Sequence, residues 1–124
     1  MSLKFVSLLF IAAVLAGCKV DLPAVDSGTV EVNAEGRVTK RELSPSQVHV
    51  LSDWIRTHKT GWTFKVEDSF PARMIYLKRG SETVAVVDMS REDRIKIKNF
   101  VRTLTPEDRA ILGPVLTSFL AFTP

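Results

Sequence analysis

Alternation of apolar and polar residues predicts strands in the middle of the chain. Trp62, Phe64 and Val66 alternate with polar residues, as on a strand with one buried face. The segments 73–78 and 83–87 are apolar on both sides in their middles, and strands of that kind are usually covered on both faces. Turn-forming residues separate the three runs. We therefore expect a meander of three antiparallel strands.

Two flanking segments allow more than one interpretation. Residues 90–104 fit either a capped helix or a fourth strand, and the strict alternation of charged and apolar residues over 94–98 favours the strand. Residues 29–43 fit a weak hairpin, a single edge strand or a disordered segment, because they offer little apolar surface. The sheet is therefore expected to have three or four strands.

Helical patterns occur at two places. The run Ser44-Pro45-Ser46-Gln47 has the residues of a capping box with proline at the first helical position. The apolar stripe that follows predicts a helix near 45–60, closed by Gly61 in the left-handed conformation. A second helical segment near 106–121 begins after Thr105 and is interrupted at Gly113-Pro114.

Together these elements predict an α+β fold. We expect a small antiparallel sheet, packed by the helix near 45–60 and by the C-terminal helical segment near 106–121.

The first residues have the pattern of an export signal. Residues 5–16 are apolar apart from Ser7. The run is shorter than the roughly 20 residues that span a membrane, and it has the length of a signal-peptide core. It is followed directly by Leu15-Ala16-Gly17-Cys18, in which small residues occupy the two positions before the cysteine.

This four-residue motif resembles the lipobox of bacterial lipoproteins. The resemblance covers residues 1–19 and implies cleavage before Cys18, a thioether-linked diacylglycerol on its sulfur and an acyl chain on its new amine. Several acyl chains make such an anchor effectively permanent. Residue 19 is lysine and not aspartate, which in this family implies the periplasmic face of the outer membrane, or the outer face of the cytoplasmic membrane where a cell has no outer one. The expected organisation is a signal peptide over 1–17, a lipidated N-terminus and flexible tether over 18–28, and one domain over 29–124.

Composition narrows the classes of function. Cys18 is the only cysteine, so the mature fold is expected to have no disulfide. The chain has 17 basic and 14 acidic residues, and without Lys4 of the signal segment the balance is about +2, which implies neither a nucleic-acid partner nor strong binding to a membrane surface.

Candidate catalytic and metal-binding groups are few. His49 and Asp53 share a helix face but lack a third ligand, and His58 lies near the apolar stripe. The adjacent acidic pairs Glu67-Asp68, Glu92-Asp93 and Glu107-Asp108 lie in expected turns or first helical turns, where acids are favoured for structural reasons. We therefore expect no enzyme, no metal and no cofactor apart from the lipid.

Two features suggest contact with a partner. A basic run fits either a solvated face or an anionic partner, and it comprises Arg91, Arg94, Lys96, Lys98 and Arg102. In the loop 68–71 an aromatic residue stands beside proline, either exposed as an interface anchor or folded back onto the sheet. The candidate partner-binding residues are Phe70, Pro71, Arg73 and Tyr76.

The function expected from the sequence is that of a membrane-anchored, non-catalytic protein-binding module, such as an adaptor, an assembly factor or an inhibitor. The alternatives are a small cell-wall hydrolase and a homo-oligomeric component of an envelope complex.

Overall fold

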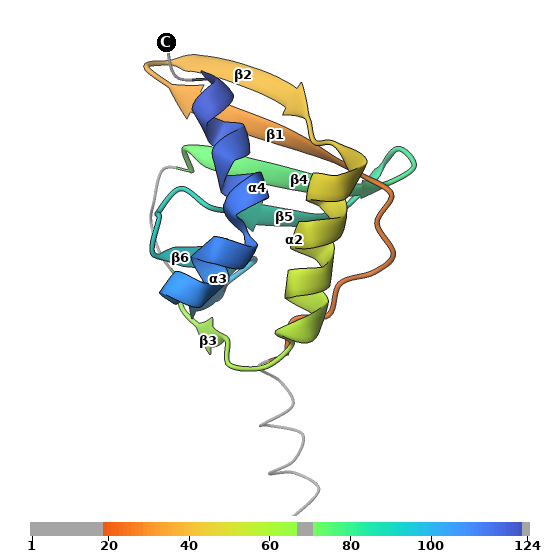
Figure 1. The fold of residues 1–124 in the computed structure, drawn as a ribbon, viewed down its shortest axis with the longest axis vertical. Coiled ribbons are helices and arrows are strands. Elements are labelled where there is room, and N and C mark those ends of the chain that lie inside the picture. Colours follow the sequence, from red (N-terminus) through yellow and green to blue (C-terminus); the bar gives the residue numbers. More distant parts are fainter. Residues whose placement is uncertain (1–18, 67–70, 123–124) are drawn as a thin grey trace, which may run out of the picture.

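The computed structural model describes residues 19–66 and 71–122, which form one antiparallel sheet with helices on one of its faces (Figure 1). Among the described residues the sheet has seven strands in the order β2-β1-β4-β5-β6-β7-β3. The strands are β1 (Ser27–Ala34), β2 (Arg37–Glu42), β3 (Thr63–Phe64), β4 (Arg73–Arg79), β5 (Glu82–Asp88), β6 (Arg94–Ile97) and β7 (Phe100–Thr103). The helices are α2 (Pro45–Thr57), α3 (Pro106–Ile111), α4 (Gly113–Leu116) and the 3-10 helix η1 (Thr117–Phe122).

The prediction of a three- or four-stranded meander in an α+β fold is wrong, because a seven-stranded sheet with short helices is a mostly-β fold. The segment 94–103 contains two strands joined by a tight turn, where one strand was expected. The predicted strand 62–66 shortens to β3, and β3 pairs with β7 at the sheet edge and not with β4. Strands β4 and β5 pair as predicted.

The segment 29–43, for which the sequence allowed several structures, lies mostly in the antiparallel hairpin of β1 and β2. Glu35 and Gly36 both have positive φ, at 52° and 76°, in the two-residue loop between β1 and β2. Such loops match the twist of the paired strands. All six residues of β2 are exposed, and four of them are charged, which protects this sheet edge from pairing with another chain.

Helix α2 begins as the sequence predicts. The Ser44 hydroxyl accepts from the backbone N–H of Gln47, and the Gln47 side chain accepts from the backbone N–H of Ser44, which completes the capping box. The helix ends at Thr57, earlier than the expected Thr60, and His58 follows it as the C-cap residue. Gly61 does have the expected positive φ of 85°, but it lies in the loop beyond.

The core lies between the sheet and the helices. Ile75 and Leu77 on β4 and Val87 on β5 are fully buried on the face that the helices cover. Leu51 and Ile55 on α2 belong to the same buried cluster. The C-terminal helical segment adds Leu112, Val115 and Phe119 to it. The break between α3 and α4 falls at Leu112, directly before the predicted Gly113-Pro114, and these two residues begin α4.

The segment before β1 packs on the domain, although a flexible tether was expected there. Val20 is 6% exposed and belongs to the core, and its backbone N–H donates to the Lys59 carbonyl at 2.9 Å. Further along, the Arg56 side chain donates to the Pro23 carbonyl, and the Asp26 N–H donates to the Lys78 carbonyl. The described chain therefore packs on the domain from Val20 onward.

Candidate functional site

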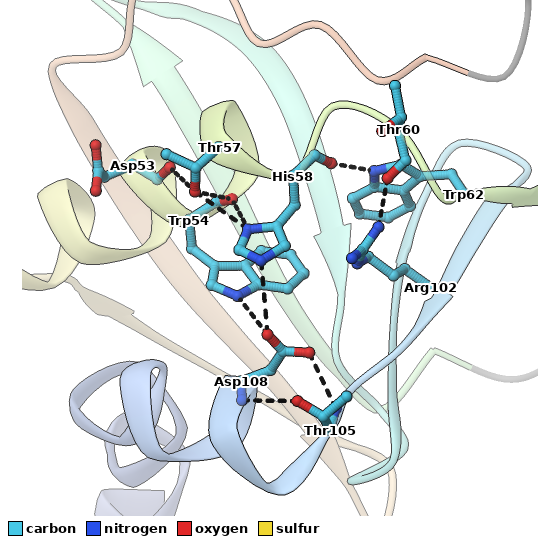
Figure 2. Close-up of polar contacts among 9 residues, drawn as sticks. All are labelled: Asp53, Trp54, Thr57, His58, Thr60, Trp62, Arg102, Thr105 and Asp108. Atoms are coloured by element: carbon cyan, nitrogen blue, oxygen red, sulfur yellow. Dashed lines mark hydrogen bonds and ion pairs between the residues drawn. The ribbon is translucent and has the colours of Figure 1, made fainter.

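The arrangement that most resembles an active site is a histidine–carboxylate pair between α2 and α3 (Figure 2). His58 Nε2 lies 3.6 Å from Asp108 Oδ1. The imidazole stacks on the Trp54 indole at 4.3 Å between ring centroids and 16° between planes. Its other nitrogen, Nδ1, lies 2.7 Å from the Trp54 carbonyl oxygen, so Nδ1 carries a proton and donates.

Asp108 is held by three hydrogen bonds and is 7% exposed. Oδ1 accepts from Trp54 Nε1 at 3.2 Å, and Oδ2 accepts from the Thr105 N–H at 3.0 Å. The Asp108 N–H in turn donates to the Thr105 hydroxyl, which completes a second capping box. Burial alone raises the pKa of Asp108, but the Thr105 and Trp54 bonds and the charge of His58 outweigh it, so this pKa lies below its usual range.

These contacts give the pair a structural role. The Asp108 oxygens cap α3 and bind the Trp54 indole, and the His58 Nδ1 proton is committed to a backbone carbonyl. Because Nδ1–H is fixed, an ion pair with Asp108 requires a second proton on Nε2. We refer to Trp54, His58, Thr105 and Asp108 as the helix joint, since they fasten the end of α2 to the start of α3.

The other candidate catalytic groups do not converge with this pair. Glu92 and Asp93 are exposed in the loop before β6, and Glu107 is exposed at the start of α3. The pair Glu67-Asp68 lies outside the described residues. Within 19–66 and 71–122, no three His, Cys, Asp or Glu residues are placed to hold a metal ion, so His49 and Asp53 gain no third ligand there.

The second candidate site is the face of the sheet opposite the helices. In Figure 1 the described helices all lie on one side of the sheet. Strand alternation places Glu31, Met74, Tyr76, Val86 and Lys96 on the other side, where each is partly buried by its neighbours. We call these five residues the open face. No described helix lies on that side of the sheet (Figure 1).

The open face is continuous across the central strands. Tyr76 lies opposite Val86 in the β4–β5 register, and Met74 lies opposite Glu31 in the β1–β4 register. On its other side Met74 faces Asp88, which in turn faces Lys96. An apolar centre is thus bordered by charges of both signs, an arrangement like that of protein interfaces, with their apolar core and polar rim.

Tyr76 is fixed within this face. Burial raises the pKa of its phenol, and the negative charge of Glu31 and a hydrogen bond to the Glu31 side chain raise it further. The hydroxyl therefore stays protonated and donates a hydrogen bond to the Glu31 carboxylate. A tyrosine held in one orientation loses little entropy on binding, which suits an interface anchor.

Two of the predicted partner-binding residues, Arg73 and Tyr76, lie on opposite faces of the sheet. Tyr76 lies on the open face, whereas Arg73, three residues earlier, lies on the helix-covered face with its guanidinium 5.8 Å from the Phe119 ring centroid. Pro71 is exposed, and Phe70 lies outside the described residues. Which of the four residues contact a partner stays a prediction.

The basic run is also divided between surfaces. Arg94 and Lys96 share the uncovered side of β6. Arg102 points to the opposite side, donates to the Thr60 carbonyl, and lies over the Trp54 ring with 5.9 Å to the centroid. Lys98 occupies the β6–β7 turn with a φ of 55°. The run therefore does not make a single anionic-partner site.

Of the open face, the sequence analysis named only Tyr76 as a partner-binding residue, although the sequence indicates two further members. The segments 73–78 and 83–87 are apolar on both faces, and strands of this kind are usually covered on both. Met74 and Val86 are apolar residues on the face that the helices leave open. Glu31 and Lys96 join them only through the cross-strand register, which a single sequence does not give.

Comparisons with protein-family models, with curated proteins and with solved structures found no match for this chain. In the described part of the chain, no helix is long and apolar enough to cross a membrane.

Proposed function

We propose that this protein is a lipid-anchored envelope protein that binds another protein through the open face. The anchor is Cys18, modified with diacylglycerol and an N-acyl chain after cleavage behind Leu15-Ala16-Gly17. The proposed location is the periplasmic face of the outer membrane, or the outer face of the cytoplasmic membrane in a cell without one.

The observation that carries the binding role is the unequal cover of the central strands. β4 and β5 have apolar residues on both sides, and the described helices pack on only one of them. Met74 and Val86 on the uncovered side remain partly accessible to water. A partner that covers them gains hydrophobic free energy, at about 25 cal/mol for each Å² of apolar surface removed from water.

The helix joint supports a non-catalytic role. Its His58 and Asp108 have the composition of a catalytic pair, but His58 Nδ1 donates to the Trp54 carbonyl, and the Asp108 carboxylate caps α3 and accepts from the Trp54 indole. His58 Nδ1 and both carboxylate oxygens of Asp108 therefore have structural partners, which favours a structural role for the pair.

The experiment is affinity capture of the full chain from its own cells after in-cell crosslinking. Val86→Glu places a charge in the centre of the open face, and Ile111→Glu is the matched control, because Ile111 is 50% exposed on α3. We expect one stoichiometric partner with the wild type and the control, and roughly tenfold less of it with Val86→Glu, a loss of about 1.4 kcal/mol in binding.

Equal recovery of the partner by both variants contradicts the open-face assignment. Capture of a second copy of this chain alone identifies a homo-oligomer. Thermal melts of the two variants confirm that both are folded.

A further inference from the structure

The beginning of the described chain fixes where a lipid anchor would hold the domain. Val20 is buried in the core and bonded to Lys59, so Lys19 alone separates it from Cys18. Two residues span at most about 7 Å. An acylated Cys18 therefore holds the adjoining end of the domain at the bilayer surface and does not leave it at the end of a long tether.

The end in question is formed by the last turn of α2, the loop after it and β3. Figure 1 shows that β3 and the end of α2 lie at the same end of the domain as the first described residues. The β1–β2 hairpin lies at the opposite end, because β2 and β3 are the two edge strands of the sheet. Six strand spacings of about 4.8 Å separate these edges, or roughly 29 Å.

This end exposes large apolar side chains. Phe64 is 60% exposed and Val66 is 71% exposed, two of the four large hydrophobic residues that the described chain leaves open to water. The Phe64 ring contacts Phe100 edge-on with 5.8 Å between centroids, so the side chain is supported from one side. An isolated exposed apolar residue needs no explanation, but two on one short segment beside an anchor point do.

The charges around this end are close to balanced. Three lysines lie there, Lys19, Lys59 and Lys65, but Asp21 lies 4.0 Å from Lys59, and Glu67 and Asp68 follow Val66 in the sequence. The case for a membrane contact therefore depends on the exposed aromatic and aliphatic side chains, which are the residues that enter the headgroup region of a bilayer.

We propose that the end of the domain formed by β3 and residues 65–66 is a second membrane contact, with Phe64 and Val66 in the headgroup region of the bilayer. This inference rests on the proposed lipid anchor at Cys18. The sheet then stands on its β3 edge, β2 is the strand farthest from the membrane, and the open face points along the membrane toward a partner anchored beside it.

The test is depth-dependent fluorescence quenching on the full chain. Val66→Cys and, separately, Val38→Cys are labelled with a small environment-sensitive fluorophore, since Cys18 is the only natural cysteine and lipidation blocks it. Val38 is the matched control, a valine that is 54% exposed on β2 at the opposite edge. Because both sites are exposed, neither substitution removes a core contact. The proteins are reconstituted in vesicles of phosphatidylethanolamine and phosphatidylglycerol, with and without brominated acyl chains.

We expect brominated lipid to lower the emission of the probe at position 66 by about twofold or more and to leave position 38 unchanged. Equal emission of both probes in the two kinds of vesicle overturns the membrane contact. The intact mass of the same samples reports acylation separately. An acylated protein with an unquenched probe refutes only the contact, whereas an unacylated protein refutes the anchor whatever the probe shows.

Discussion

Removal of the Asp108 carboxylate tests the helix joint. Asp108→Ala deletes one half of the α3 capping box, which costs about 1 kcal/mol. It also leaves the buried Trp54 N–H without its acceptor, at about 1–3 kcal/mol. The sum is about 2–4 kcal/mol, and for a domain of this size it lowers the melting temperature by roughly 10–20 °C. The assay is thermal unfolding followed by circular dichroism.

The same carboxylate predicts an acid-dependent loss of stability. The pKa of Asp108 is lowered in the folded state, so its contribution is fully present above the unfolded pKa of about 3.9 and is lost as pH falls through the folded pKa. Asp108→Asn should therefore melt below the wild type at neutral pH, and the difference should shrink below about pH 4.

Asp53→Asn on the exposed face of α2 is the control and should melt like the wild type. If Asp108→Ala melts within about 3 °C of the wild type, a change typical of surface substitutions, the joint does not fasten the helices and the reasoning is refuted.

Three further predictions concern other parts of the chain. Tyr76 is the only tyrosine, so absorbance titration reads it alone; its pKa should lie above 10, and Glu31→Gln should lower it, whereas an unchanged titration would disprove the contact between the two side chains. Glu35→Asn should stabilise the β1–β2 turn by about 0.5–1 kcal/mol in urea unfolding, because asparagine adopts positive φ more readily, and a loss of stability would contradict the turn geometry. Cys18→Ser should abolish incorporation of labelled palmitate, and a protein that still takes up the label would place the lipid elsewhere.

Local signals in the sequence identified several elements correctly. Several elements depend on residues close together in the chain: the capping box at Ser44, the helix start after Thr105, the new helix start at Gly113-Pro114 and the strands β4 and β5. Their stabilising contacts are made within a few residues, so a single sequence contains the information that specifies them.

The errors concern long-range pairing. β3 has two paired residues and lies beside β7, and neither the length of the strand nor its partner follows from the alternation of Trp62, Phe64 and Val66. The β1–β2 hairpin has few buried side chains and is stabilised largely by its pairing with β4, which is remote in sequence. Strand register decides which residues share a face.

The candidate sites show the same division. The sequence shows that β4 and β5 have apolar residues on both faces, which indicates that both faces of the sheet are covered. The division of Arg73 from Tyr76 follows from the alternation of side chains along one strand, which an argument from proximity in sequence overlooked. The helix joint was not predictable, because His58 and Asp108 are fifty residues apart and meet only through the packing of α2 against the C-terminal helices.

Binding of a partner through the open face can be tested by site-specific photocrosslinking in living cells. A benzophenone amino acid replaces Val86 on the open face or, as the control, Ile111 on α3, and crosslinked products are identified by mass spectrometry. We expect one discrete adduct with another envelope protein from position 86 and none from position 111. No adduct from position 86, or the same adduct from both positions, would contradict binding through the open face.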